Sequence, residues 1–336
     1  FRDTAQVIDG KVVVTAEWFR KQSHDMLLKK DNMLILGYPM WNGQMWENIG
    51  EMEAKGWELS VNWNDKKGDF SYGVGVNLSS IRNKAIKLNG APIYTQSFNG
   101  DYIIRNEEGH EISQFYGYVA DGLFQNQTEI NAHTGEHGEI LQPNAQPGDI
   151  RFKDLNNDGV LDDKDKTYIG SAFPDLMVGI NANFSWKNID FMANFYGTIG
   201  NDVYNTTKGR YSGAGGENVY AGAYNAAWHG EGTSYDIPRL SVNDANMNYK
   251  RVSSFFVEDG SYLRCKQLQI GYTFPKTWTK VCTLRISFSA QNPFTITKYS
   301  GMDPEAAATG AVTESGVDWA GYPNPRTYLF GLNINF

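Results

Sequence analysis

The chain has 336 residues, of which 41% are hydrophobic and 14% aromatic, with 35 glycines and a formal net charge of -8. Its negative charge argues against a nucleic-acid partner, because phosphate binding requires a basic face. No stretch approaches the roughly 18 consecutive apolar residues of a membrane-spanning helix. The strands of a membrane barrel instead carry their apolar signal in alternation, so a mean hydropathy of -0.48 is compatible with an outer-membrane location.

Alternation of apolar and polar residues predicts β-strands along much of the chain. Between residues 70 and 78, for example, Phe70, Tyr72 and Val74 alternate with serine and glycine. Residues 1–3 resemble the end of an earlier strand. The predicted strands that follow, about eight, are 12–19, 57–64, 70–78, 176–186, 189–195, 262–274, 284–291 and 328–336.

One predicted strand, 262–274, changes phase near Lys266 and Gln267. Before this point Leu263 and Cys265 are the apolar members, and after it they are Leu268 and Ile270. A β-bulge would return both sets to one face.

The connections separate two architectures that share this alternation, a transmembrane barrel and a soluble sandwich. Short links and long ones alternate strictly. A bacterial outer-membrane barrel has tight periplasmic turns and long extracellular loops, whereas a sandwich usually has short loops at both ends. The pattern favours an all-β, antiparallel transmembrane β-barrel. The short links are 64–69, 187–188 and 275–280, and the long ones are 79–174, 200–258 and 293–326.

Several motifs in chain order resemble the SusC/RagA-like TonB-dependent receptors of the outer membrane. Cys265 and Pro293 depart from the family pattern, which usually has leucine there. The motifs are 114–118 (QFYGY), 121–125 (DGLFQ), 255–264 (FFVEDGSYLR), 271–275 (GYTFP), 291–294 (QNPF), 297–305 (TKYSGMDPE) and the ending 322–336.

The resemblance implies that residues 1–336 form the C-terminal part of a larger barrel, of about 22 strands in such receptors. The plug domain and the N-terminal strands would lie outside this sequence. It also implies a Gram-negative outer-membrane location, surrounding lipid, energy from the TonB–ExbB–ExbD system and a SusD-like surface lipoprotein that captures the ligand. The expected cargo is an oligosaccharide or a peptide.

The segment 154–165, here named the calcium-type loop, matches the template D-x-[DN]-x-[DN]-G. A hard dication requires several oxygens that converge on one point, and Gly159 allows the sharp turn. We expect a structural Ca²⁺ that stabilises the extracellular connection 79–174; the alternative is a solvated acidic turn. The expected ligands are Asp154, Asn156, Asp158, Val160 through its carbonyl, Asp162 through water, and Asp165.

Signals for an enzyme are weak, and no catalytic residue is predicted. His133 and His137 have the i,i+4 spacing of a zinc motif but lack its glutamate and enclose a glycine, so a solvated pair in a loop is expected. Aromatic residues in the long connections are candidates for stacking on sugar rings, although they could equally pack the loops. They are Trp41, Trp46, Tyr94, Trp228, Tyr299 and Trp319.

The sequence therefore predicts a TonB-dependent importer of nutrient oligomers. The alternative is a secreted, calcium-binding β-sandwich that binds glycans.

Overall fold

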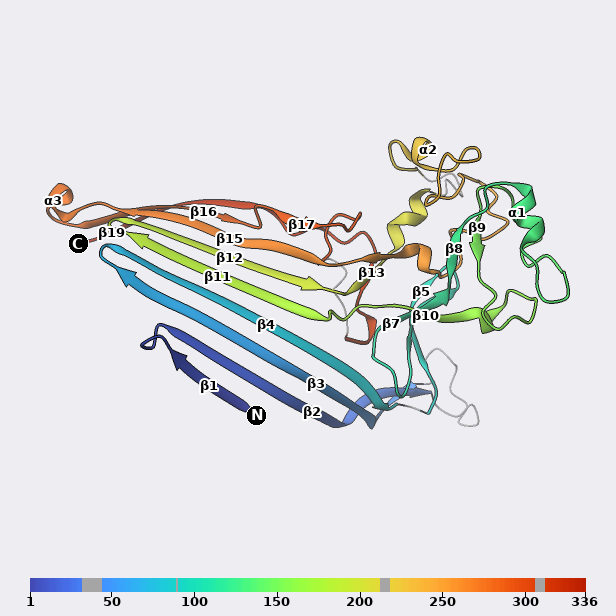
Figure 1. Cartoon of the computed structure of the whole chain (residues 1–336), viewed down its shortest axis with the longest axis horizontal. Helices are drawn as coiled ribbons and strands as arrows, with labels where there is room; N and C mark the ends of the chain where they lie inside the picture. The colour runs from blue at the N-terminus through green and yellow to red at the C-terminus, as the bar shows by residue number, and fades with distance from the viewer. Residues whose placement is uncertain (32–43, 89, 212–217, 306–311) are drawn as a thin grey trace.

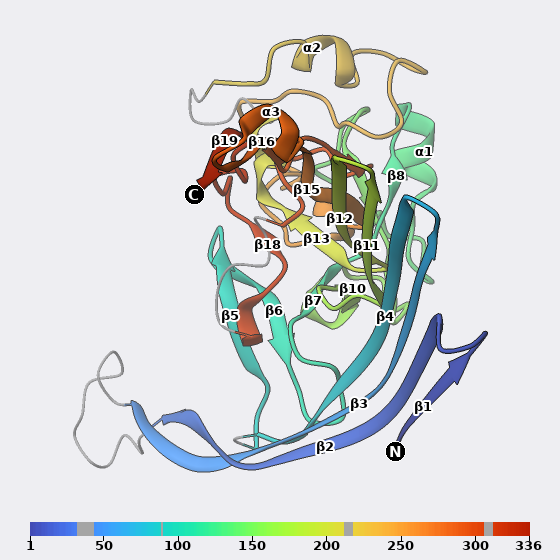
Figure 2. The ribbon, with the colours of Figure 1, turned by 90° about the vertical axis from the view of Figure 1, so that its left-hand side faces the viewer.

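The dominant element of the computed structural model is one large antiparallel sheet of ten strands. The structure describes residues 1–31, 44–88, 90–211, 218–305 and 312–336. The long strands run side by side (Figure 1), and the sheet curls around a concave face (Figure 2). In sheet order the strands are β1 (Arg2–Val7), β2 (Val12–Asp31), β3 (Gln44–Lys67), β4 (Phe70–Lys87), β11 (Leu176–Trp186), β12 (Ile189–Ile199), β15 (Tyr262–Thr273), β16 (Thr283–Gln291) and β19 (Thr327–Asn335), with β17 (Thr295–Thr297) paired to β15.

The long connections contain three smaller sheets and several short helices. The four-stranded sheet is β10 (Lys166–Ser171), β7 (Gln114–Tyr118), β6 (Asp101–Asn106) and β5 (Ile93–Phe98); the three-stranded sheet is β14 (Val257–Asp259), β13 (Asp202–Asn205) and β18 (Val317–Asp318); β8 (Ala120–Leu123) pairs with β9 (Ile150–Phe152). The α-helices are α1 (Gln127–Ala132), α2 (Ala223–Ala226) and α3 (Lys276–Thr279), and the 3₁₀ helices are Asp163–Asp165, Thr206–Tyr211, Ser254–Phe256 and Val312–Glu314. None of the helices in these described ranges has the length and hydropathy needed to cross a membrane.

The strict alternation of short and long connections is confirmed. Short turns gather at the end of the sheet that also carries the C-terminus, and the long connections gather at the other end (Figure 1). The predicted link 64–69 is shorter than expected, because β3 continues to Lys67 and only two residues turn the chain. Gly68 takes a φ of 61° there, a left-handed conformation that glycine adopts without strain.

All eight predicted strands are present, and Arg2 and Asp3 belong to a further paired strand, β1, which continues to Val7. The expected lengths of three strands were wrong: β2, β3 and β4 run for 20, 24 and 18 residues. Their extensions carry charged residues among the apolar ones, so apolar alternation no longer marks a strand there.

The bulge in β15 is confirmed. Asn194 of β12 pairs with Gln267 and its neighbour Phe195 pairs with Cys265, so Lys266 is the extra residue. The partner strand adjusts at the same level, because β16 ends at Gln291 and β17 begins only at Thr295.

The two faces of the large sheet differ in polarity, as one row of paired residues across the strands shows for each face. One apolar row is Tyr72, Phe184, Phe191, Ile270, Phe288 and Phe330, across β4, β11, β12, β15, β16 and β19. A polar row lies on the opposite face, three residues away along the strands: Asn62, Gly75, Asn181, Asn194, Gln267, Gln291 and Thr327.

Within the described ranges, no second sheet packs on the apolar face. Phe330 is 87% exposed, and Trp57 and Trp186 of the same face are 41% and 53% exposed. A soluble protein rarely leaves such a wide apolar surface uncovered. The sandwich alternative is therefore wrong, and the outward apolar face suits the lipid of a barrel wall.

The buried core lies in the long connections rather than in the large sheet. We name the folded parts of residues 88–175, 200–261 and 292–326 the connection domain. Its largest cluster takes Phe98 and Phe115 from the first connection, Tyr204 and Phe256 from the second, and Val317 from the third. The three connections therefore fold as one unit above the end of the sheet (Figure 1).

Truncation of this cluster should loosen the connection domain selectively. Phe256 is fully buried, with its ring 5.2 Å from those of Phe98 and Tyr204. We expect Phe256→Ala to lower the stability of the connection domain by about 3–5 kcal/mol. Limited proteolysis of the protein in detergent should then cleave the connections faster. Tyr235→Ala, at a site 67% exposed, is the matched control and should leave the rate unchanged; equal rates for both variants would contradict a shared core.

Candidate functional site

The inner, concave face of the sheet carries a row of amides around two glycines. A Cβ atom on Gly75 would lie 2.6 Å from amide atoms of both Asn62 and Asn181, and one on Gly73 would lie 2.4 Å from Asn64 Oδ1. The asparagine side chains thus occupy the space that side chains on β4 would need. The result is a polar wall that offers both donors and acceptors.

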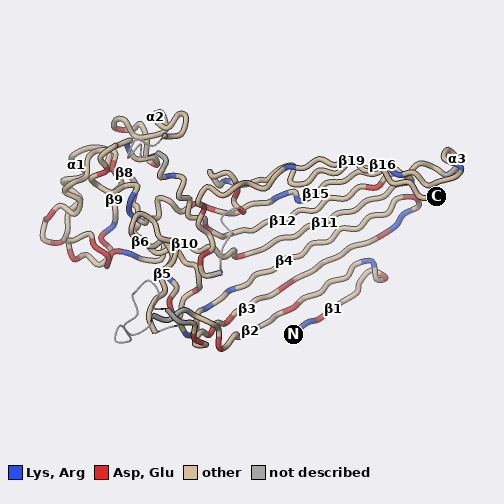
Figure 3. The backbone as a smooth tube through the Cα atoms, turned by 180° about the vertical axis from the view of Figure 1, so that it is seen from behind, with Lys and Arg blue, Asp and Glu red and all other residues tan. Residues whose placement is uncertain are grey.

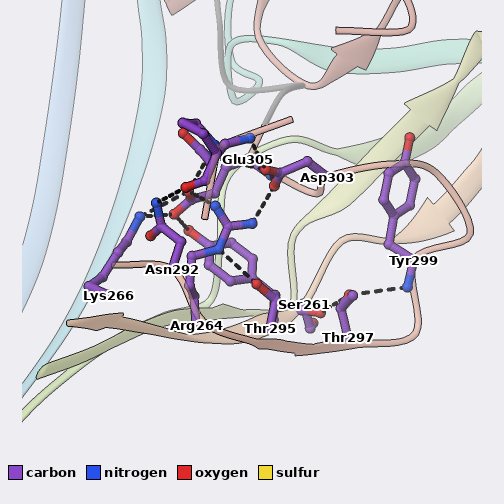
Figure 4. A network of polar contacts seen from close by, with 12 residues as sticks. Ser261, Arg264, Lys266, Asn292, Thr295, Thr297, Tyr299, Asp303 and Glu305 are labelled. Atoms are coloured by element: carbon purple, nitrogen blue, oxygen red, sulfur yellow. Dashed lines mark hydrogen bonds and ion pairs between the residues drawn. The ribbon is translucent and has the colours of Figure 1, made fainter. Parts of the chain in front are cut away.

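An ion-pair network joins this wall to the connection domain (Figure 4). Arg264 of β15 is only 3% exposed, and it donates to Asp303 Oδ1 at 2.5 Å and to Glu305 Oε2 at 2.5 Å. Lys266, two residues further on the same strand, donates to Glu305 Oε1 at 2.6 Å. A buried guanidinium is tolerated because each side of it meets a carboxylate or a hydroxyl, the latter from Thr295 at 2.9 Å.

The carboxylates of this network also organise the third connection. Asp303 Oδ2 accepts from the backbone N–H of Asn324 at 2.9 Å, and the side chain of Asn324 donates to Glu305 Oε2 at 2.8 Å. The Tyr262 hydroxyl donates to Glu305 Oε1 at 2.7 Å. Residues 303–305 and Asn324 of the third connection are therefore held together beside β15.

A cavity of about 350 Å³ lies beside the network, between the inner wall and the connection domain. Among its lining residues are Met177, Tyr196, Thr198 and Tyr262 from the wall, and Phe173, Asn201, Asp202 and Glu305 from the connections. Thr198 Oγ1 and Asn201 Oδ1 are buried and have no hydrogen-bond partner among the described residues. Burial, together with Asp259 and Asp175, raises the pKa of Asp202. The cavity combines aromatic and apolar surface with acceptor oxygens, which suits a ligand rich in hydroxyl or amide donors.

The calcium-type loop turns its acidic side chains onto its own backbone. The backbone N–H of Gly159 donates to Asp154 Oδ2 at 2.9 Å, and that of Asp158 donates to Asn156 Oδ1 at 2.9 Å. Val160 N–H donates to Asp158 Oδ1 at 3.1 Å. Hydrogen bonds from the Asn156 amide and from Val160 lower the pKa of Asp158, so this carboxyl stays ionised.

The second half of the loop forms a capping box. Asp165 is fully buried and accepts from Leu155 N–H at 2.9 Å and from Asp162 N–H at 2.8 Å. Asp162 in turn accepts from Lys164 N–H at 2.8 Å and begins the short 3₁₀ helix. These bonds close the loop into one compact turn.

Two observations bear on whether this loop fits a cation. Asp154 Oδ1 is buried without a hydrogen-bond partner in the described structure, as expected for an oxygen reserved for another ligand. Glu139, which the sequence reasoning missed, brings its carboxylate against Gly159, in the space a side chain there would occupy. No group of three or more His, Cys, Asp and Glu side chains is placed to hold a metal within the described ranges. A calcium ion would therefore also draw on the amide of Asn156 and the carbonyl of Val160.

The two histidines with zinc-like spacing do not form a site together. His133 Nε2 lies 2.9 Å from the carbonyl oxygen of Phe152, and its ring meets Phe124 edge-on. Burial lowers the pKa of His133, which favours the neutral ring. His137 is exposed.

Two of the candidate aromatic residues serve the packing of the connections. Tyr299 is 6% exposed and donates from its hydroxyl to Asp318 Oδ2 at 2.6 Å. Burial, followed by this hydrogen bond, raises the pKa of Tyr299. Trp228 donates from Nε1 to Gln125 Oε1 at 3.1 Å and covers Gly148, where a Cβ would lie 2.3 Å from its ring.

Three other candidates remain accessible to a ligand. Trp46, Tyr94 and Trp319 are 62%, 45% and 49% exposed. Trp41 lies outside the described residues.

The chain is similar over nearly its whole length to proteins known as TonB-dependent receptors. No family model matches the chain. The chain is 32% identical to TonB-dependent receptor P3 of Formosa agariphila over 98% of its own length and 33% of that protein. It is 27% identical to TonB-dependent receptor SusC of Bacteroides thetaiotaomicron, over 98% of the chain and 30% of that protein. It thus spans about a third of the length of these relatives.

A solved structure, the RagAB peptide transporter, shares the fold. The TM-score is 0.76 at 21% sequence identity, over 99% of this chain and 34% of that one. Together with the two-faced sheet, these likenesses identify the chain as part of a SusC/RagA-like TonB-dependent receptor, a β-barrel protein of the Gram-negative outer membrane.

Proposed function

We propose that the parent protein imports nutrient oligomers across the outer membrane, with energy from the TonB–ExbB–ExbD system, and has no enzymatic activity. The observation that carries this proposal is the two-faced register of the sheet, apolar outside and amide-rich inside. Such a wall separates lipid from a polar passage. The related proteins named as TonB-dependent receptors, SusC and a peptide transporter support the same role.

We propose glycan or peptide fragments as the cargo class. The cavity beside the Arg264 network offers unpaired acceptor oxygens, and exposed Tyr94 and Trp319 lie on the connections where a ligand would enter. Aromatic faces stack on sugar rings and on planar peptide groups alike, so these side chains accommodate both classes.

A SusD-like surface lipoprotein is the proposed partner. The connection domain is folded around its own core. A capping protein could therefore bind it without the entropic cost of ordering the loops. The test is purification of the tagged full-length parent from outer membranes in mild detergent. We expect a lipoprotein to co-purify at a one-to-one ratio by mass spectrometry. Recovery of the parent protein alone, with intact connections by proteolysis, would contradict the partnership.

We propose a structural role for Ca²⁺ in the calcium-type loop. When bound, the ion would neutralise the convergent carboxylates and hold the first connection in its fold. Asp154, Asn156, Asp158, Val160 and Asp165 would supply oxygen ligands, with Asp162 acting through water and Glu139 adding negative charge. The buried, unpaired Asp154 Oδ1 supports this assignment.

Removal of one ligand should distinguish the calcium loop from a solvated turn. We expect Asp158→Asn to weaken calcium binding by roughly tenfold, because affinity follows the number of ligand charges. Asp163→Asn removes the same charge from an 87%-exposed side chain outside the ligand set and should change little. Calorimetric titration of the full-length parent with Ca²⁺, after chelation, measures both. Absence of binding to the unmodified protein would establish the solvated turn.

Loss of the Arg264 network should impair uptake through the third connection. Arg264→Gln leaves Asp303 without its cation, while Glu305 keeps Lys266. Breaking one side of a buried pair costs about 3–5 kcal/mol. We expect faster proteolysis between residues 292 and 326 and reduced ligand uptake by cells. Lys266→Gln, at a side chain 37% exposed, should have a much smaller effect. Equal effects of the two variants on proteolysis and uptake would show that the buried Arg264 guanidinium contributes no more than the exposed Lys266.

A further inference from the structure

The outward face of the sheet carries a basic row directly beyond its apolar band. Arg20, Lys55 and Arg82 are backbone partners across β2, β3 and β4. Lys84 lies two residues beyond Arg82 on the same face. Basic residues lie on β2, β3 and β4 towards the ends of these strands that are nearer to the connection domain (Figure 3). We name Arg20, Lys55, Arg82 and Lys84 the basic row.

The position of the basic row relative to the membrane follows from strand geometry. Along β4 the outward residues run from Phe70 at the short-turn end to Ser80, which is paired with Trp57, itself paired with Trp18. Ten steps of about 3.3 Å give about 33 Å along the strand. At a tilt of about 40°, this corresponds to about 25 Å of membrane thickness, the height of the apolar band of an outer-membrane barrel. The Trp18–Trp57 pair therefore marks the interface, and the basic row lies just outside it, at headgroup level.

A buried carboxylate holds two of the cations in place. Glu53 is 7% exposed, and its Oε2 and Oε1 accept from Arg20 Nε at 2.6 Å and from Lys55 Nζ at 2.6 Å. The side chains of Arg20 and Lys55 remain 51% and 52% exposed. The Glu53 carboxylate thus holds both cations from the side nearer to the sheet, and their exposed sides remain open to an external anion.

The row keeps an excess of positive charge. Arg82 pairs with Asp175, and both side chains are more than half exposed. With Glu53, two carboxylates therefore stand against the four cations of the basic row. Glu51, further out, faces His24 at 3.6 Å.

We propose that the basic row binds the phosphate of an outer-leaflet glycolipid, whose acyl chains lie on the apolar band below it. The outward face below the row is apolar, so the ligand must join an anionic head to a hydrocarbon tail. Arg20 and Arg82 can donate two hydrogen bonds each to phosphate, and Lys55 and Lys84 add point charges. This binding is independent of import, which concerns the inner face.

The test uses the full-length parent protein, delipidated in detergent and titrated with diphosphorylated lipid A, with binding followed by native mass spectrometry. The variant Lys55→Gln/Arg82→Gln/Lys84→Gln removes three exposed cations and keeps the Arg20–Glu53 pair. We expect it to bind lipid A at least about tenfold more weakly, with less dependence on salt. Lys67→Gln is the matched control, because Lys67 lies on the same strand and face at the opposite membrane boundary.

Dephosphorylated lipid A provides the second arm, because it retains the acyl chains. We expect dephosphorylated lipid A to bind the unmodified protein as weakly as phosphorylated lipid A binds the triple variant. Equal binding of the two lipids to the unmodified protein, or equal loss in the triple variant and Lys67→Gln, would overturn it. Inorganic phosphate binding as tightly as lipid A would assign the row to a free anion. Far-UV circular dichroism and resistance of the barrel to heat in detergent confirm that each variant is folded.

Discussion

The constraint on which this structure depends is the need to pair every backbone N–H and C=O group that crosses lipid. Hydrocarbon offers these groups no partner, so a membrane strand must bond to a neighbour on each side. The described sheet meets this need for its inner strands and ends in two edges, β1 and β19. In the barrel of the family those edges pair with further strands, since an open edge in lipid would carry unpaired groups.

Pairing in register has a second consequence, because side chains then alternate between lipid and the interior. Neither face can build a dense core: the outward face meets acyl chains and the inward face meets a polar passage. The core is displaced into the connections, where Phe115, Tyr204 and Phe256 are fully buried. The connections are therefore a folded unit with defined positions for Asp303 and Glu305. Because these positions are defined, both carboxylates lie within hydrogen-bond distance of the buried Arg264 guanidinium on the wall.

Local patterns in the sequence predicted the main strands of the sheet, but neither the full lengths of β2 to β4 nor the connection domain. Period-two alternation predicted the strands, and its phase change at Lys266 predicted the bulge, because both depend on neighbours within a few residues. The small sheets rest on partners far apart in the chain, such as Tyr204 with Val317, which no local pattern reveals. Likewise the calcium-type loop is a local motif, whereas the approach of Glu139 to Gly159 depends on how the connection folds. The outer ends of β2 to β4 escaped prediction because charged residues replace the apolar members there.

The bulge in β15 explains why the inner wall and the connection domain meet at this level. A regular strand keeps the same neighbour on each side along its length. On the side away from β12, however, β15 pairs with β17 at Tyr262–Arg264 and with β16 at Gln267–Thr273. Between these points the bonds from Asn292 N–H to the Lys266 carbonyl and from Cys265 N–H to the Phe294 carbonyl, both 3.1 Å, close the ladder. Pro293 fits the gap because it has no N–H to satisfy. The partner chain can thus leave the wall here without orphaned backbone groups, and the same level presents Arg264 and Lys266 to the connection that departs.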